Sequence, residues 1–182
     1  MQKIKIALCD KDKFYCERFA AYMMNHKAQE IELNIYSTIE QFTGDEKMGN
    51  FDLVIAGSDK RGTIYGIYDV SEKIGVSPWY WWADVPVKKH KTLYVDAPTT
   101  VSKAPSVKYR GVFLNDEDWG LMPWSNKTYE PSDVKGEIGP RTNERIFELL
   151  LRLRANTYWP AMHECTLPFF LTKGNREAAK KY

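Results

Sequence analysis

The sequence predicts an α/β protein with parallel strands, and two stretches of the chain carry this prediction. Residues 1–56 show patterns in the order strand, helix, strand, helix, strand, which is typical of a layered α/β domain. Residues 107–164 show a strand, a polar loop, a helix, a second strand and a second polar loop. We therefore expect an N-terminal α/β layered domain that begins with 1–56, its remainder and a linker over 57–104, and a second α/β region over 105–182.

In the first stretch, residues 3–8 alternate apolar and polar side chains at the period of a strand, and apolar residues then recur at helical spacing over 14–23. A second strand, a short helix and a third strand are expected at 31–36, 39–42 and 51–56. The third strand is an apolar, β-rich run of the kind that lies in a parallel sheet. The order is that of a doubly wound domain.

Two acidic residues, Asp10 and Asp12, follow the first strand directly. Together with the strand over 51–56 they resemble the first half of a response-regulator receiver domain, in which such acids hold a magnesium ion beside a phosphoacceptor aspartate. Gly57 stands where that aspartate is expected. A receiver-like regulatory module without its phosphoacceptor is therefore one alternative function. The alternative role for the two acids is a helix-capping turn.

The next segment combines a glycine-bearing helix with a cluster of aromatic residues. Residues 58–72 predict a helix in which Gly62 and Gly66 allow close packing. Four large aromatic residues follow at 79–82. We interpret them either as a plug between layers or as a platform for a sugar ring. A non-catalytic carbohydrate-binding remnant is thus the second alternative function.

The composition excludes several classes of protein. The 26 basic and 24 acidic residues leave a net charge of +2, which is too balanced for a protein that binds a nucleic-acid backbone. No apolar stretch has the length of a membrane span or a signal peptide, so we expect no nucleic-acid and no membrane partner. Cys9, Cys16 and Cys165 form neither a CxxC pair nor an even set, which favours a reducing, cytoplasmic compartment.

Polar side chains gather where the two strands of the second stretch end. The strand over 107–114 runs into Asn115 and three consecutive acids at 116–118. The second strand, over 156–162, runs into a His-Glu pair. In parallel α/β barrels the functional groups lie at the carboxyl ends of the strands. The two polar runs are therefore the candidates for a functional site.

A helix is expected between these two strands. Gly139 and Pro140 introduce it, and Thr142 or Asn143 is predicted as its N-cap. Its buried stripe is formed by apolar residues at helical spacing: Ile146, Leu149, Leu150 and Leu153.

Three motifs give these segments a family resemblance: SDKRGTIYGIYDVSEKIGVSPWYWWADVPV, YRGVFLNDEDWGLMPW and IFELLLRLRANTYWPAMHE. From about residue 54 to residue 182 the chain resembles the α-glucuronidases of glycoside hydrolase family 115. The resemblance implies an N-terminal α/β accessory domain and the first two units of a (β/α)₈ barrel. It also implies an inverting reaction that removes glucuronic acid or its 4-O-methyl ether from xylan side chains, and a homodimer.

The resemblance assigns roles to the polar residues at the strand ends. Asp116 matches the family motif and is the candidate catalytic carboxylate, which would bind the substrate or orient the water, while the general acid is not identified. Asn115, Trp119, His163 and Glu164 are the candidate substrate-binding residues, and a glucuronoxylan-derived oligosaccharide is the expected partner. We expect no cofactor. We also expect no metal, because consecutive residues on a strand point to alternate faces and cannot all bind one ion.

The length of the second stretch limits what this chain is expected to do. A barrel of eight units needs about 250 residues, so we expect an incomplete barrel and a fragment of an inverting α-glucuronidase that is inactive alone. Inversion requires two carboxyl groups about 6.5–9.5 Å apart, and the sequence does not identify the second. Because the receiver-like and glucuronidase-like segments meet near residue 56, we also predict a join of two unrelated segments that pack poorly on each other.

Overall fold

The computed structural model describes the chain except for residues 1–3, 26–30, 46–47, 96–99 and 161. It divides the chain into two compact units, Met1–Ser102 and Lys103–Tyr182. Each unit combines helices with a parallel sheet. The predicted α/β fold class is therefore confirmed.

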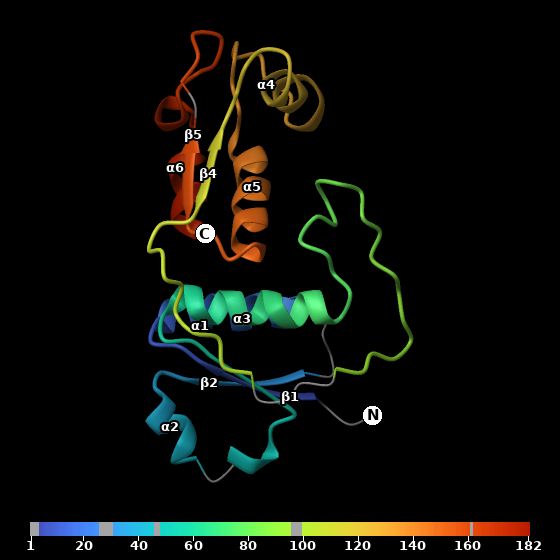
Figure 1. Cartoon of the computed structure of the whole chain (residues 1–182), viewed down its shortest axis with the longest axis vertical. Helices are drawn as coiled ribbons and strands as arrows, with labels where there is room; N and C mark the ends of the chain where they lie inside the picture. Colours follow the sequence, from blue (N-terminus) through green and yellow to red (C-terminus); the bar gives the residue numbers. More distant parts are fainter. Residues whose placement is uncertain (1–3, 26–30, 46–47, 96–99, 161) are drawn as a thin grey trace. The chain divides into compact units, whose positions relative to one another are not determined.

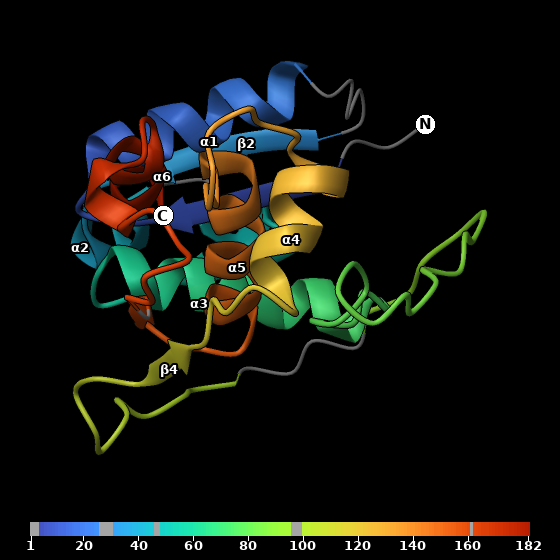
Figure 2. The same ribbon diagram turned by 90° about the horizontal axis from the view of Figure 1, so that it is seen from above.

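The first unit is built on a parallel three-stranded sheet. Its elements are β1 (Ile4–Cys9), α1 (Lys13–Asn25), β2 (Ile31–Tyr36), α2 (Ile39–Thr43), a 3-10 turn (Met48–Asn50), β3 (Leu53–Ala56) and α3 (Lys60–Lys73). The strand order is β2-β1-β3, and both pairings are parallel. Helices α1 and α3 run along one face of the sheet and α2 lies on the other (Figures 1 and 2). This is the doubly wound order that the sequence predicts.

An aromatic core holds α2 and the start of β3 against the sheet. Ala7 and Cys9 of β1 are buried with Tyr36 and Phe42, and Phe51 packs against them. The ring of Tyr36 stands edge-on to the rings of Phe42 and Phe51, with centroids 5.3 and 6.1 Å apart. Edge-to-face aromatic packing of this kind adds to the free energy gained by burial.

The packing of the first unit is continuous across residue 56. Gly66 of α3 lies so close to β3 that an added Cβ would be 2.8 Å from Cγ2 of Ile55. Thr63 on the same helix is fully buried, and its hydroxyl donates to the backbone oxygen of Cys9 at 3.4 Å. The expectation that residues 1–56 pack poorly on the segment after them is therefore wrong, because α3 completes the layer over β1 and β3.

The second unit contains two parallel strands and the helices that surround them. Its elements are β4 (Gly111–Leu114), α4 (Leu121–Trp124), a π-helical turn (Ser125–Tyr129), α5 (Pro140–Arg152), β5 (Thr157–Pro160), a 3-10 turn (Phe169–Leu171) and α6 (Asn175–Lys181). Strands β4 and β5 pair in parallel, with Val112 opposite Tyr158. A strand, a helix and a parallel strand form the repeating unit of an α/β barrel.

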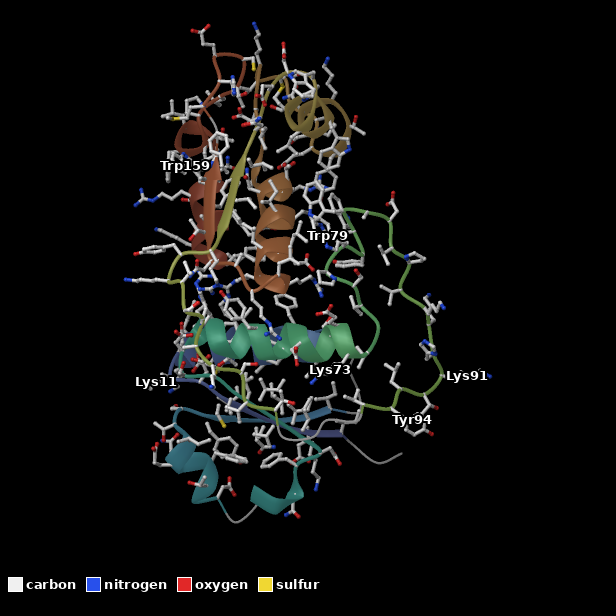
Figure 3. The ribbon with its side chains drawn as sticks, viewed as in Figure 1. Lys11, Lys73, Trp79, Lys91, Tyr94 and Trp159 are labelled. Carbon is white, nitrogen blue, oxygen red and sulfur yellow. The ribbon has the colours of Figure 1, made fainter. Side chains whose placement is uncertain are left out.

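The two faces of this strand pair differ. On one face, the ring of Tyr158 packs edge-on against Phe147 of α5 and Phe169, with centroids 5.4 and 5.8 Å apart. Phe113 and Trp159, which are also paired in register, form an exposed edge-to-face pair. Since successive residues of a strand point to opposite faces, Trp159 projects from β5 away from α5 (Figure 3).

The start of α5 differs from the prediction. The helix begins at Pro140 with Gly139 as its N-cap, and the two predicted caps lie inside the first turns. The carboxylate of Glu130 supplies the capping oxygens instead, because it accepts from the backbone N–H groups of Arg141 at 3.0 Å and Thr142 at 2.9 Å. Proline loses no hydrogen bond at the first helical position, and a carboxylate is favourable at the positive end of a helix.

Candidate active site

The polar residues predicted as site residues follow β4 and β5 in the second unit. Asp116 is the second residue after β4, and His163 is the third residue after β5. Because the two strands are parallel neighbours, their carboxyl ends lie at the same edge of the sheet. The fold therefore brings the two polar runs toward each other, as expected for a site of the barrel type.

Asp116 is a buried carboxyl group. Its side chain is 6% exposed, and its Oδ1 has no hydrogen-bond partner in the part of the chain that the structure describes. The backbone oxygen of Asp116 accepts a hydrogen bond from the hydroxyl of Thr166 at 2.8 Å. Desolvation raises the pKa of Asp116, and the positive charge that His163 carries when protonated opposes this rise. The backbone thus fixes a carboxyl group that keeps one oxygen uncommitted.

The turn that carries Thr166 depends on Gly136. This glycine has a φ of +76°, and an added Cβ would collide with the backbone oxygen of Cys165. Its own backbone oxygen accepts from the N–H of Leu167 at 2.8 Å. Only glycine combines a left-handed backbone with so close an approach. Gly136 therefore allows the close backbone contact with the turn that contains Cys165 and Thr166.

His163 and Glu117 form a second contact between the chain segments that follow β4 and β5. Nε2 of His163 lies 3.2 Å from Oε1 of Glu117, and the two side chains are 44% and 23% exposed. An acidic side chain in a loop often points into solvent. The side chain of Glu117 instead contacts His163. Both charges act on the pKa of Asp116, so the three groups form one electrostatic cluster.

Tyr158 is a neighbour of Asp116 that the sequence analysis did not identify. Burial raises the pKa of the Tyr158 hydroxyl, and the charge of Asp116 adds to the rise. The hydroxyl therefore stays protonated near Asp116. The alternation along β5 predicts that Tyr158 and Trp159 face opposite sides. It does not predict the side to which Asp116 turns after β4 ends.

The other predicted residues lie at the surface. Asn115 and Glu164 are exposed, and Trp119 is 82% exposed. Trp124 is a further tryptophan in the segment after β4, and it is stacked on Tyr129, with ring centroids 5.1 Å apart and an interplanar angle of 5°. The ring of Trp119 is thus open to a ligand, whereas one face of Trp124 is already occupied.

Asp10 and Asp12 form a capping turn at the start of α1. The N–H of Asp12 donates to Oδ1 of Asp10 at 2.8 Å, and the N–H of Tyr15 donates to Oδ1 of Asp12 at 2.9 Å. An added Cβ on Gly57 would collide with the backbone nitrogen of Thr63, so an aspartate does not fit there. Within the described residues, no three His, Cys, Asp or Glu side chains are grouped so as to hold a metal ion. These contacts do not favour the receiver-like alternative.

Comparisons with known proteins identify relatives of the chain. Residues 102–182 match the model of glycosyl hydrolase family 115. The chain is also 50% identical to part of a solved family GH115 4-O-methyl-alpha-glucuronidase with specificity for decorated arabinogalactans, with a TM-score of 0.75. That match covers 100% of this chain and 28% of the other. No curated protein matches the chain. The resemblance to the α-glucuronidases of family 115 is therefore confirmed.

The same match corrects the prediction made for residues 1–56. Because it covers the whole chain, these residues align with the same enzyme as the residues that follow them. The expectation of a join between two unrelated segments is therefore wrong. The likeness of β1, β2 and β3 to a receiver domain is one of strand order, and a strand order by itself does not carry a function.

Proposed function

We propose, because the chain is related to glycosyl hydrolase family 115, that it forms part of the active site of an inverting α-glucuronidase. The observation that carries this proposal is the buried carboxyl of Asp116, whose Oδ1 lacks a hydrogen-bond partner among the described residues. A buried polar atom without a partner costs folding free energy. Perturbed and poorly satisfied acids of this kind cluster at functional sites.

The raised pKa of Asp116 suits this group for an interaction with a sugar oxygen. Inverting hydrolysis uses one protonated carboxyl for the leaving oxygen and one carboxylate for the attacking water, about 6.5–9.5 Å apart. Desolvation favours the uncharged form of Asp116 and so raises its pKa, which suits this group to donate a hydrogen bond or a proton. We assign it the role of a catalytic carboxyl. The opposing carboxylate must come from another strand, and we expect no hydrolysis by this chain alone.

The proposed ligand carries a terminal α-linked glucuronic acid or its 4-O-methyl ether. The family resemblance implied glucuronoxylan, whereas the solved relative is described with specificity for decorated arabinogalactans. The glucuronosyl unit is common to both proposals. Asn115, Glu164 and the ring of Trp119 are exposed. We assign hydrogen bonds to sugar hydroxyls to the first two and stacking on a pyranose to Trp119.

A carbohydrate-binding role without catalysis is the second candidate function, and it would use the exposed ring of Trp119. A large aromatic ring that is 82% exposed next to polar residues is suited to bind a sugar face. The aromatic cluster at 79–82 supports this role less well. Trp81 and Trp82 pack edge-on against each other, with centroids 4.9 Å apart.

Calorimetric titration of the full chain tests the proposed site. The ligands are an aldouronic oligosaccharide from xylan and an arabinogalactan oligosaccharide that ends in 4-O-methylglucuronic acid. We expect binding of at least one of them without release of the uronic acid. Asp116→Asn should weaken binding by about tenfold, which is the loss of one hydrogen bond to a charged or buried group. Asp118→Asn removes an exposed carboxylate two residues away and should leave binding unchanged.

Each outcome of this titration decides one part of the proposal. Absence of binding to both ligands would remove the carbohydrate site. Release of uronic acid by the purified chain would overturn the expectation that it is inactive alone. Equal losses in Asp116→Asn and Asp118→Asn would show a general charge effect and remove the assigned role of Asp116. Binding that depends on Trp119 but not on Asp116 would favour the non-catalytic role.

A cytoplasmic location and a homodimer remain proposals. Cys9 and Cys16 are buried free thiols and Cys165 is a partly buried free thiol, which suits a reducing compartment. No helix of the described residues has the length and apolarity needed to cross a membrane. Cell fractionation tests the location. Light scattering tests the dimer, for which a mass of twice 21.2 kDa is expected.

A further inference from the structure

We propose that Glu117 is a positioning residue of the candidate site: its carboxylate accepts a hydrogen bond from Nε2 of His163 and thereby directs Nδ1 of the imidazole toward a sugar hydroxyl. The proposal rests on the proposed function only in taking a carbohydrate as the ligand. It gives Glu117 a role that acts through His163 and not through contact with the ligand.

The geometry of the pair supports this role. Nε2 and Oε1 lie 3.2 Å apart as an ion pair, a separation that becomes a hydrogen bond when the ring N–H is aimed at the carboxylate. Both backbones are also held in place. The carbonyl of Glu117 accepts from the N–H of Gly120 at 3.5 Å, and the carbonyl of His163 accepts from the N–H of Thr166 at 3.1 Å. The carboxylate and the imidazole therefore meet from two ordered turns.

This contact determines which nitrogen of the imidazole carries the proton. A neutral histidine has one nitrogen that donates and one that accepts, and the partner of one nitrogen fixes the role of the other. A carboxylate only accepts, so Glu117 places the proton of His163 on Nε2. Nδ1 is then an acceptor, and the side chain is 44% exposed. A sugar hydroxyl is the group that such an acceptor binds.

The surrounding charges favour a hydroxyl over the carboxylate of a uronic acid. Three acids lie at 116–118 and a fourth is Glu164. Neither 115–126 nor 162–172 contains a lysine or an arginine. A uronate carboxylate bound beside His163 would be repelled by the carboxylate of Glu117, whose Oε1 lies 3.2 Å from Nε2, whereas a neutral hydroxyl would not. We therefore infer that this side of the site binds the neutral, hydroxyl-bearing part of the ligand.

Nuclear magnetic resonance of the full chain tests the pairing without any ligand. Long-range proton–nitrogen spectra of the ¹⁵N-labelled chain at about pH 8, where an ordinary imidazole is neutral, report which ring nitrogen carries the proton. His163→Gln identifies the signal. We expect His163 to be protonated on Nε2 in the wild type and in Glu117→Gln, whose amide oxygen still accepts. Glu117→Ala should give a mixture of the two tautomers, and the exposed neighbour Asp118→Ala should change nothing.

Calorimetry then tests the role in binding, with an aldouronic oligosaccharide and its carboxyl-reduced counterpart as ligands. Glu117→Ala should weaken both by the same factor, about five- to tenfold, which is the loss of one ordered hydrogen bond. Glu117→Gln should restore affinity to within about twofold of the wild type. Thermal unfolding should show that both variants remain folded.

The outcomes separate this inference from the proposed function. An unchanged His163 spectrum in Glu117→Ala, or a wild-type imidazole protonated on Nδ1, would overturn the pairing. A changed spectrum with unchanged affinity would overturn the positioning role. A loss confined to the acidic ligand would overturn the assignment to the neutral part. If the wild-type chain binds neither sugar, the proposed function fails, and the positioning role fails with it, whereas the spectra still decide whether Glu117 fixes the tautomer.

Discussion

Replacing Asp116 by asparagine is expected to stabilise the second unit at neutral pH. The folded state raises the pKa of Asp116 above its ordinary value of 3.8, so folding favours the protonated form. The sign is set by linkage: the stability that this group contributes is fully present below pH 3.8 and is lost as the pH rises through the folded pKa. At pH 7 the buried carboxylate therefore carries a penalty that a neutral amide of the same shape avoids.

The size of this effect depends on the contacts of the carboxyl group. One buried acceptor without a partner costs about 1–3 kcal/mol, and the attraction of His163 for the charged form offsets part of this cost. We therefore expect a gain of about 1 kcal/mol for Asp116→Asn at pH 7, close to the lower bound. For a domain of 60–100 residues this corresponds to a rise in Tm of about 4–8 °C.

Thermal unfolding followed by circular dichroism at pH 7 and pH 3 measures the gain. It should be present at pH 7 and absent at pH 3, where the carboxyl of the wild type is already protonated. Asp118→Asn, at an exposed carboxylate, should leave Tm unchanged at both pH values. The reasoning would be refuted if Asp116→Asn lowered Tm at pH 7, or if the same gain persisted at pH 3. A gain in stability together with a loss of ligand affinity is the expected signature of a functional group.

Three further substitutions test the scaffold and the ligand face of the site. Glu130→Ala should lower the free energy of unfolding in urea by about 2 kcal/mol, because the start of α5 loses its capping oxygens; a loss below about 0.5 kcal/mol would contradict the capping role. Gly136→Ala should cost about 3 kcal/mol through a left-handed backbone and a steric collision, whereas Gly75→Ala, with φ +95° and open space around it, should cost only about 1 kcal/mol; equal costs would show that the collision is relieved. Trp119→Ala should change the free energy of unfolding by less than about 0.5 kcal/mol because the ring is exposed, and should weaken oligosaccharide binding severalfold in a fluorescence titration; unchanged affinity would remove Trp119 from the site.

The strands of the first unit were predictable because their signal is local. The alternation over 3–8 and the apolar run at 51–56 each specify a strand within a few residues, and both strands form at nearly these bounds. The hydrogen bond from Thr63 to Cys9 joins residues that are 54 positions apart, and no local pattern encodes such a contact. Packing across residue 56 was therefore mispredicted although the elements on both sides were found.

In helix α5, too, the local pattern predicts the buried residues but not the long-range contact. Ile146 and Leu150 are buried as the helical spacing predicts, whereas Leu153 is exposed because it is the C-cap and lies past the last helical residue. The cap at the other end comes from Glu130, which precedes the helix by a turn and a loop. Local propensity favours Thr142 as a cap, and the carboxylate of a distant residue replaces it.

The sequence predicted where the candidate site lies, at the ends of the two strands, but not which of the acidic residues there is buried. The sequence shows three consecutive acids after β4, but only the structure shows that Asp116 turns inward while Asp118 stays exposed. The backbone of Asp116 is bound by the hydroxyl of Thr166, which lies 50 positions away in the sequence, and no local pattern encodes such a contact. The sequence did not identify Glu117 as a site residue either, because its partner His163 lies in the segment after β5.

These contacts explain how Asp116 can change its charge without unfolding the segment that carries it. The residue is tied through its backbone oxygen to Thr166, and the turn of Thr166 is tied to Gly136. The hydroxyl of Thr166 also acts on the carboxyl of Asp116, since a hydrogen bond from it lowers the pKa of that group, whereas the link from Leu167 to Gly136 joins backbone atoms only. Protonation, substitution by asparagine or engagement of a ligand therefore alters the electrostatics of the site while the backbone links persist. A group held in this way is preorganised for a ligand, since its position is fixed before the ligand arrives.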